Sequence, residues 1–224
     1  MSTRPATDRV RVRRAPGRAV YDEQAVHDIL DAGMVCHLGY VVDGQPYVVP
    51  TLYGRDGRRL VLHGSSASRA LLTGSTLPVC VTVTHLDGLI LARSLFNHSA
   101  NYRSVVVIGQ AKVVGEQRDK EAALRVLTEH LVPGRWEEAR TPTDKELRAT
   151  AVLQLDLAEC SAKVRTGPPN DDEDDLRLDV WAGEVPIELV ARRPVADPGL
   201  TPGIGVPASI ARWVPGIERH EGRR

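Results

Sequence analysis

Apolar residues recur along most of the chain in short runs separated by turn signals, a pattern typical of an antiparallel sheet. The segment 34–64 holds three such runs, divided by Asp43-Gly44 and Asp56-Gly57. These dipeptides accept the positive φ angles that tight hairpins require. The segment therefore predicts three strands joined by two hairpins.

Further runs of similar length predict more strands. They span 78–84, 88–93, 103–114, 150–157 and 161–167. The run Ser104–Ile108 is apolar at nearly every position, so both faces of this strand should be covered. Seven or eight strands with few helices predict an antiparallel barrel or sandwich.

Two segments show the spacing of amphipathic helices. The first, 21–33, has apolar residues at 26, 29 and 30, with Asp22 as a possible N-cap and Gly33 as a stop. The second, 118–131, is the clearest helix in the chain. Residues 193–224 hold five prolines and five glycines, which predicts a loose tail with a short helix near 207–213.

Charge and cysteine usage limit the class of protein. Lys+Arg and Asp+Glu both total 29, so no net field attracts nucleic acid or an anionic membrane. Six arginines in the first 20 residues predict a flexible basic arm at 1–19, before a folded domain at 20–192 and a tail at 193–224. Three isolated cysteines predict neither a zinc site nor disulfides. Without a signal or membrane segment, we expect a soluble cytoplasmic protein.

Arginine stands beside serine at two predicted strand boundaries. Ser68-Arg69 follows one strand, and Arg103-Ser104 opens another. Two guanidinium forks with nearby hydroxyls can hold a phosphate dianion. The residues alone favour surface arginines and turn serines over a phosphate site, and His63 and His98 fit ordinary strand ends as well. The histidines show no metal-ligand spacing, so we expect no metal held by protein side chains alone.

In combination and order, several segments resemble one known family. They are 49–69, 92–111, 129–136, 145–153, 161–175 and 180–186. Together they resemble the flavin-nucleotide-binding branch of the pyridoxamine 5′-phosphate oxidase-like superfamily, which includes the Nim-type nitroimidazole-resistance proteins. The resemblance covers about residues 20–190. It implies a mainly β fold with flanking helices, the FMN-binding split barrel, in which a six-stranded antiparallel Greek-key barrel forms a homodimer with FMN at the interface.

The resemblance also implies which residues contact the cofactor. They are Val49, Pro50, Thr51, Leu52 and Tyr53 on one strand; His63, Gly64, Ser65, Ser68 and Arg69 in the phosphate loop; Tyr102, Arg103 and Ser104 on a second strand; and Lys163, Arg165 and Trp181, which complete the site of the second subunit. His63, His98 and Tyr102 are the candidates for polarising flavin or substrate. Ala70 stands where many relatives carry a lysine, so Arg103 is expected to supply the second phosphate-binding cation.

The implied function is that of an FMN-dependent oxidoreductase. Reduced nicotinamide would pass hydride to the flavin, which would reduce a small acceptor such as a nitro-heterocycle or quinone. The substrate-binding C-terminal segment of the vitamin-B6 oxidases is missing, so oxidation of pyridoxamine phosphate is not expected. Three alternatives stay open: a split barrel that binds the deazaflavin F420 with help from the N-terminal arginines, a haem protein with His63 or His98 as axial ligand, and a flavin-binding protein without catalysis.

Overall fold

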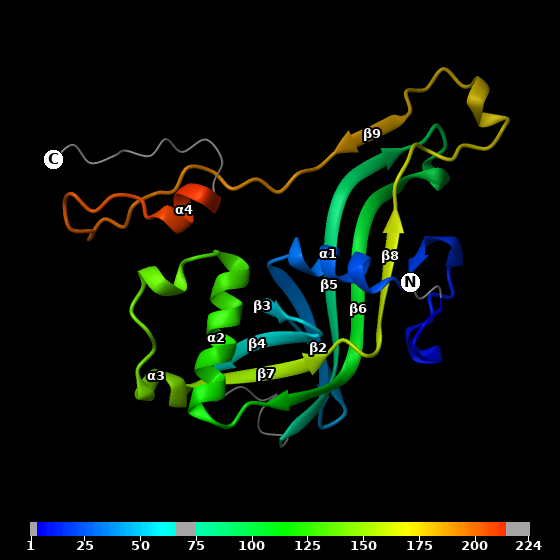
Figure 1. Cartoon of the computed structure of the whole chain (residues 1–224). Helices are drawn as coiled ribbons and strands as arrows, with labels where there is room; N and C mark the ends of the chain where they lie inside the picture. The colour runs from blue at the N-terminus through cyan, green and yellow to red at the C-terminus, as the bar shows by residue number, and fades with distance from the viewer. Residues whose placement is uncertain (1–3, 66–74, 214–224) are drawn as a thin grey trace.

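The computed structural model describes residues 4–65 and 75–213, and these form one antiparallel sheet with flanking helices (Figure 1). The strands are β1 (Ala19–Val20), β2 (Val35–Val42), β3 (Gln45–Asp56), β4 (Arg59–Ser65), β5 (Thr76–Leu91), β6 (Ser99–Val113), β7 (Thr150–Asp156), β8 (Cys160–Arg165) and β9 (Gly183–Pro186). The helices are α1 (Glu23–Asp31), α2 (Gln117–Leu131), α3 (Asp144–Ala149) and α4 (Ala208–Trp213).

Six of the strands close into a barrel in the order β5-β2-β3-β4-β7-β6, because β6 pairs with β5 as well as with β7. All of these pairings are antiparallel. β4 pairs with β7 and not with β5, its successor in the chain, which gives the Greek-key connection. The six-stranded Greek-key barrel expected from the sequence is confirmed.

The β5–β6 hairpin extends well beyond the barrel. β5 is one continuous strand of 16 residues where the sequence predicted two, and its register shifts between Leu86 and Gly88. The outer part of the hairpin, residues 85–103, is called the arm below. β8 flanks it on the β6 side and β9 on the β5 side, as Figure 1 shows.

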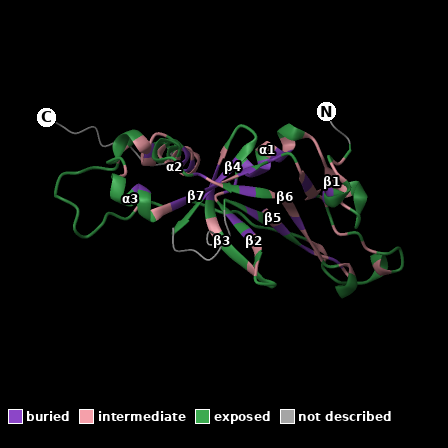
Figure 2. Cartoon of the chain, turned by 90° about the horizontal axis from the view of Figure 1, so that it is seen from below, coloured by how far each residue is buried: buried purple, intermediate pink, exposed green. Residues whose placement is uncertain are grey.

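The barrel interior is packed with aliphatic side chains around one tyrosine, and buried residues gather along β4–β7 (Figure 2). The Tyr53 hydroxyl donates to the Leu30 carbonyl, and burial raises the pKa of Tyr53 above its ordinary value. Burial likewise raises the pKa of the Cys36 thiol to about 12. α2 packs so closely on β3 that a Cβ on Gly54 would lie 2.7 Å from the Leu127 Cα.

The described part of the N-terminal segment, from residue 4, lies against the barrel, where the sequence predicted a flexible arm. Val10 is buried, and the Thr7 hydroxyl donates to Glu159 at 2.6 Å. Arg9 lies 3.4 Å from the same carboxylate, while Arg11 and Arg13 both pair with Asp8. Three of the six arginines of this segment therefore share two carboxylates.

The C-terminal segment crosses from the arm back to α2 (Figure 1). Residues 187–207 form no helix or strand and are mostly exposed. α4 ends this path, and its Ser209 is fully buried and bonded to Glu138. α4 confirms the short helix predicted near 207–213. Within the described ranges, no helix is long and apolar enough to cross a membrane.

Candidate functional site

The first half of β3 has an open edge. Gln45–Leu52 pairs with β2, but β4 joins β3 only from Tyr53 onward. Among residues 4–65 and 75–213, the backbone groups on the other edge therefore meet no strand. Val49, Pro50 and Leu52 are exposed here, whereas the Tyr53 side chain lies in the core. The open N–H and C=O groups can bind the polar edge of a ring laid along β3.

The end of β4 lies beside this open edge. The Thr51 hydroxyl is 3.4 Å from the carbonyl oxygen of His63, so the two strands stay in contact where their ladder ends. His63, Gly64 and Ser65 are all exposed. The sequence-predicted residues Ser68 and Arg69 lie outside the described residues. The structure thus brings together the described members of the first two predicted groups, except the Tyr53 side chain.

The third predicted group lies on and beside the arm. Tyr102 and Ser104 are half-buried between β5 and β8, and the Ser104 hydroxyl donates to the Lys163 carbonyl. The Arg103 fork donates to both carboxylate oxygens of Asp87, at 2.9 and 2.8 Å. This bonding lowers the pKa of Asp87. In the single chain, Asp87 thus pairs with the guanidinium that was expected to supply a second phosphate-binding cation.

Arg165 takes part in a buried hydrogen-bond network. It is buried, and its guanidinium donates to the Asn101 side chain and to the carbonyls of Gly167 and Pro168. Asn101 in turn donates to Glu184 at 2.7 Å. These bonds join β6, β8 and β9. Arg165 therefore supports the arm, in contrast to the exposed cation expected beside Lys163.

An apolar surface covers the outer side of the barrel over β2, β3 and β5, and is called the barrel face below. Cross-strand partners point to one face of a sheet, and the pairs Val35–Leu52, His37–Pro50 and Gly39–Val48 lie here. Val48 is 68% exposed, and Cys80, which pairs with Gly39, is exposed beside it. Exposed apolar surfaces of this extent mark binding or association sites.

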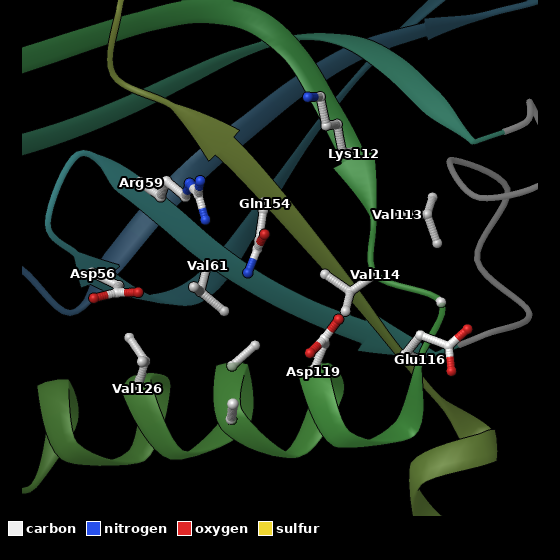
Figure 3. A pocket seen from close by; sticks show the side chains of 13 residues that line it. Asp56, Arg59, Val61, Lys112, Val113, Val114, Glu116, Asp119, Val126 and Gln154 are labelled. Atoms are coloured by element: carbon white, nitrogen blue, oxygen red, sulfur yellow. The ribbon is translucent and has the colours of Figure 1, made fainter.

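A cavity of about 590 Å³ lies between α2 and the strands β4, β6 and β7 (Figure 3). Arg59 and Lys112 stand on its strand side, and Asp119 projects from α2. Val61 and Gln154 form part of its floor. None of the residues predicted from the sequence lines this cavity, so it is separate from the predicted site.

Sequence reasoning missed the acidic partners that shape the arm. Asp171 opens the acidic run 171–175, yet its side chain is only 2% exposed because Arg93 binds it through both backbone and guanidinium. No local pattern links two residues 78 positions apart. Trp181 follows this run and is exposed at the start of β9.

Comparisons with known proteins extend this description. A family model described as pyridoxamine 5′-phosphate oxidase matches residues 22–164. A flavocytochrome structure from Azotobacter vinelandii is 41% identical, with a TM-score of 0.88, covering 93% of this chain and 97% of that chain. An FAD- and haem-binding protein from Mycobacterium smegmatis is 34% identical, with a TM-score of 0.84, covering 88% and 97%.

A more distant structure shares the fold. It comes from Bacteroides thetaiotaomicron, is described as a 5-nitroimidazole antibiotic resistance protein, and is 21% identical with a TM-score of 0.54 over 65% of this chain and 86% of that chain. The comparison with curated proteins finds no match.

Proposed function

Because this chain belongs to the pyridoxamine 5′-phosphate oxidase family, we propose that it is a flavin-binding redox protein that carries haem as a second cofactor. The observation that carries the proposal is the near full-length likeness to a flavocytochrome, at 41% identity over 93% of this chain. The second relative, described as binding FAD and haem, is also alike over most of its length. The nitroimidazole-resistance protein supports the fold alone at 21% identity.

The residues at the open edge of β3 fit a flavin. Exposed backbone groups between Val49 and Leu52 match the polar edge of a flavin ring, and the Thr51 hydroxyl lies beside them. The chain after Ser65 would hold the phosphate through Ser68 and Arg69. When bound, the flavin would accept hydride from reduced nicotinamide and pass electrons on, to haem or to a nitro-heterocycle or quinone. FMN and FAD share the chemistry of this site.

Haem is commonly bound by an imidazole ligand and apolar surface, and the chain exposes both. His63 at the end of β4 and His98 on the arm are both exposed, and the barrel face offers apolar cover. When bound, haem iron would supply one-electron transfer. The deazaflavin alternative has less support, because the descriptions of the two similar structures name flavin and haem and not F420, and because three of the six N-terminal arginines expected to hold its acidic tail pair with Asp8 and Glu159.

We also propose a homodimer in which the barrel face is covered and Trp181 of one copy reaches the site of the other. Val48 and Trp181 are 68% and 67% exposed in the single chain. Large apolar side chains with this exposure are typical of an apolar interface. An obligate interface of this kind buries roughly 2,000 Å² or more. In a dimer, Cys80 should resist alkylation. Sedimentation as a monomer with fast alkylation of Cys80 would contradict the proposal.

The test of function is the cofactor content of the purified protein. Flavin released by denaturation is identified as FMN or FAD by chromatography, and haem is measured as its pyridine complex in the same sample. We expect one flavin and one haem per chain, with flavin reduced by a nicotinamide donor. If the protein contained flavin and no haem, the proposed function would be flavin-dependent reduction of a small acceptor such as a nitro-heterocycle or quinone. Bound flavin that no donor reduces would point to flavin binding without catalysis.

A further inference from the structure

The tip of the arm, residues 93–98, presents an imidazole between exposed apolar side chains. Leu95 and Phe96 are 86% and 93% exposed, and His98 is exposed directly after them. Trp181, 67% exposed, lies at the same end of the arm, since its ring is next to Gly183 and Gly183 pairs with Leu91. A cluster of exposed leucine, phenylalanine and tryptophan side chains usually marks a surface that a ligand or partner covers.

A hydrogen bond fixes which nitrogen of His98 is free. Nδ1 lies 3.0 Å from the Ser94 carbonyl, which can only accept, so Nδ1 carries the proton. In the neutral ring, the lone pair then belongs to Nε2. Histidines that bind metals through one nitrogen almost always donate the other N–H to a carbonyl or carboxylate. His98 therefore has the arrangement of a metal ligand before any metal is bound.

The tip is also held rigidly. The Phe96 amide donates to the Ser94 hydroxyl, and the Asn97 side chain donates to Asp172. At its base, Arg93 binds the nearly fully buried Asp171 through two bonds of 2.7 and 2.8 Å. A side chain mounted in this way loses little conformational freedom on binding, which favours affinity.

Other histidines in the described ranges lack this combination. His85 and His130 are also bonded to carbonyls, but both are half-buried, His85 against α1 and His130 within α2. His37 and His63 are exposed, and no hydrogen bond fixes the free nitrogen of either ring among the described residues. His27 is half-buried and lies 3.8 Å from Glu23.

From this geometry we propose that His98 is an axial ligand of the haem iron, bound through Nε2, with Leu95 and Phe96 against the porphyrin. The assignment rests on the proposed function, which supplies the haem. It places the haem at the end of the arm, and the flavin at β3 and β4.

The test compares wild-type protein with His98→Ala, His98→Met, His37→Gln and His63→Gln. The matched control is His27→Gln, because His27 lies on α1, away from the arm and the barrel face. All variants are expressed with a haem precursor. Haem per chain, flavin per chain and the absorption spectrum are measured on each sample. We expect His98→Ala to lose haem affinity by more than the roughly 10–100-fold that follows loss of an outer partner, while keeping its flavin. Added imidazole should restore the wild-type spectrum. His98→Met should keep haem at a raised reduction potential, as methionine ligation does in cytochromes.

Two results would overturn the assignment. One is a His98→Ala protein with wild-type haem content and spectrum. The other is loss of haem in His37→Gln or in His63→Gln while His98→Ala is unaffected. Wild-type protein without haem would instead refute the haem part of the proposed function, and the flavin measurement on the same sample distinguishes this from a failure to fold.

Discussion

Replacing Asn101 with alanine should loosen the arm. The Asn101 side chain accepts from the buried Arg165 guanidinium and donates to Glu184 at 2.7 Å. A hydrogen bond to a charged group contributes about 1.5–3 kcal/mol, and loss of this one leaves part of a buried cation unsatisfied. The bond to the exposed Glu184 adds about 1 kcal/mol at most. We therefore expect Asn101→Ala to lower the free energy of unfolding by about 3 kcal/mol.

The assay is thermal unfolding at a fixed protein concentration, since association with a partner shifts the midpoint. For a chain of this size, about 3 kcal/mol corresponds to a fall in Tm of roughly 6–12 °C. The control is Asn170→Ala, because Asn170 is exposed and its loss should change stability by about 0.5 kcal/mol or less. If Asn101→Ala had the same Tm as the control, the hydrogen bonds around Arg165 would contribute nothing to the stability of the protein.

Three other changes have defined outcomes. Gly54→Ala should cost about 1–3 kcal/mol in chemical unfolding, because the added Cβ would meet α2 backbone at 2.7 Å; an unchanged midpoint would contradict the packing. Arg140 lowers the pKa of Glu146 to about 2, below its ordinary 4.5, so this pair stabilises the fold above pH 4.5 and the effect is lost as the pH falls toward 2. Glu146→Gln should remove that part of the pH dependence of unfolding, and an identical pH profile would argue against it. Arg69→Ala should weaken binding of FMN or FAD about 30-fold more than binding of riboflavin, from roughly 2 kcal/mol of phosphate contact; equal losses in a fluorescence titration would show that Arg69 does not touch phosphate.

Local signals in the sequence predicted local structure well. Asp43 and Gly44 adopt φ angles of 51° and 77°, as a tight hairpin demands, and Asp22 caps α1 by accepting from the Ala25 amide. α3 was missed, although Thr143 and Glu146 have the spacing of a capping box and form one. Docking of the N-terminal segment had no local signal, because it depends on Glu159, far along the chain.

The predicted site was harder to judge from sequence, because a charged residue looks the same whether it serves a ligand or another side chain. Arg103 and Arg165 both stand in segments that resemble cofactor-binding strands. In the fold, Asp87 pairs with Arg103 and Asn101 with Arg165. These pairings depend on the register of β5, β6 and β8, which no pattern along the chain specifies. Thr51 and His63 were named by the family resemblance, and the β3–β4 hairpin places them side by side where the ladder of the two strands ends.

The Greek-key closure of the barrel also determines the order in which the chain can fold. β5 and β6 are joined by the short loop 92–98, so this hairpin can form within microseconds. The β4–β7 ladder joins Arg59 to Asp156 and Ser65 to Thr150, so it must wait until the whole intervening chain has been brought back. Closure of such distant contacts takes milliseconds to seconds in β-rich domains. During that interval the edges of β4 and β6 are unpaired, and a nascent chain is then most exposed to aggregation.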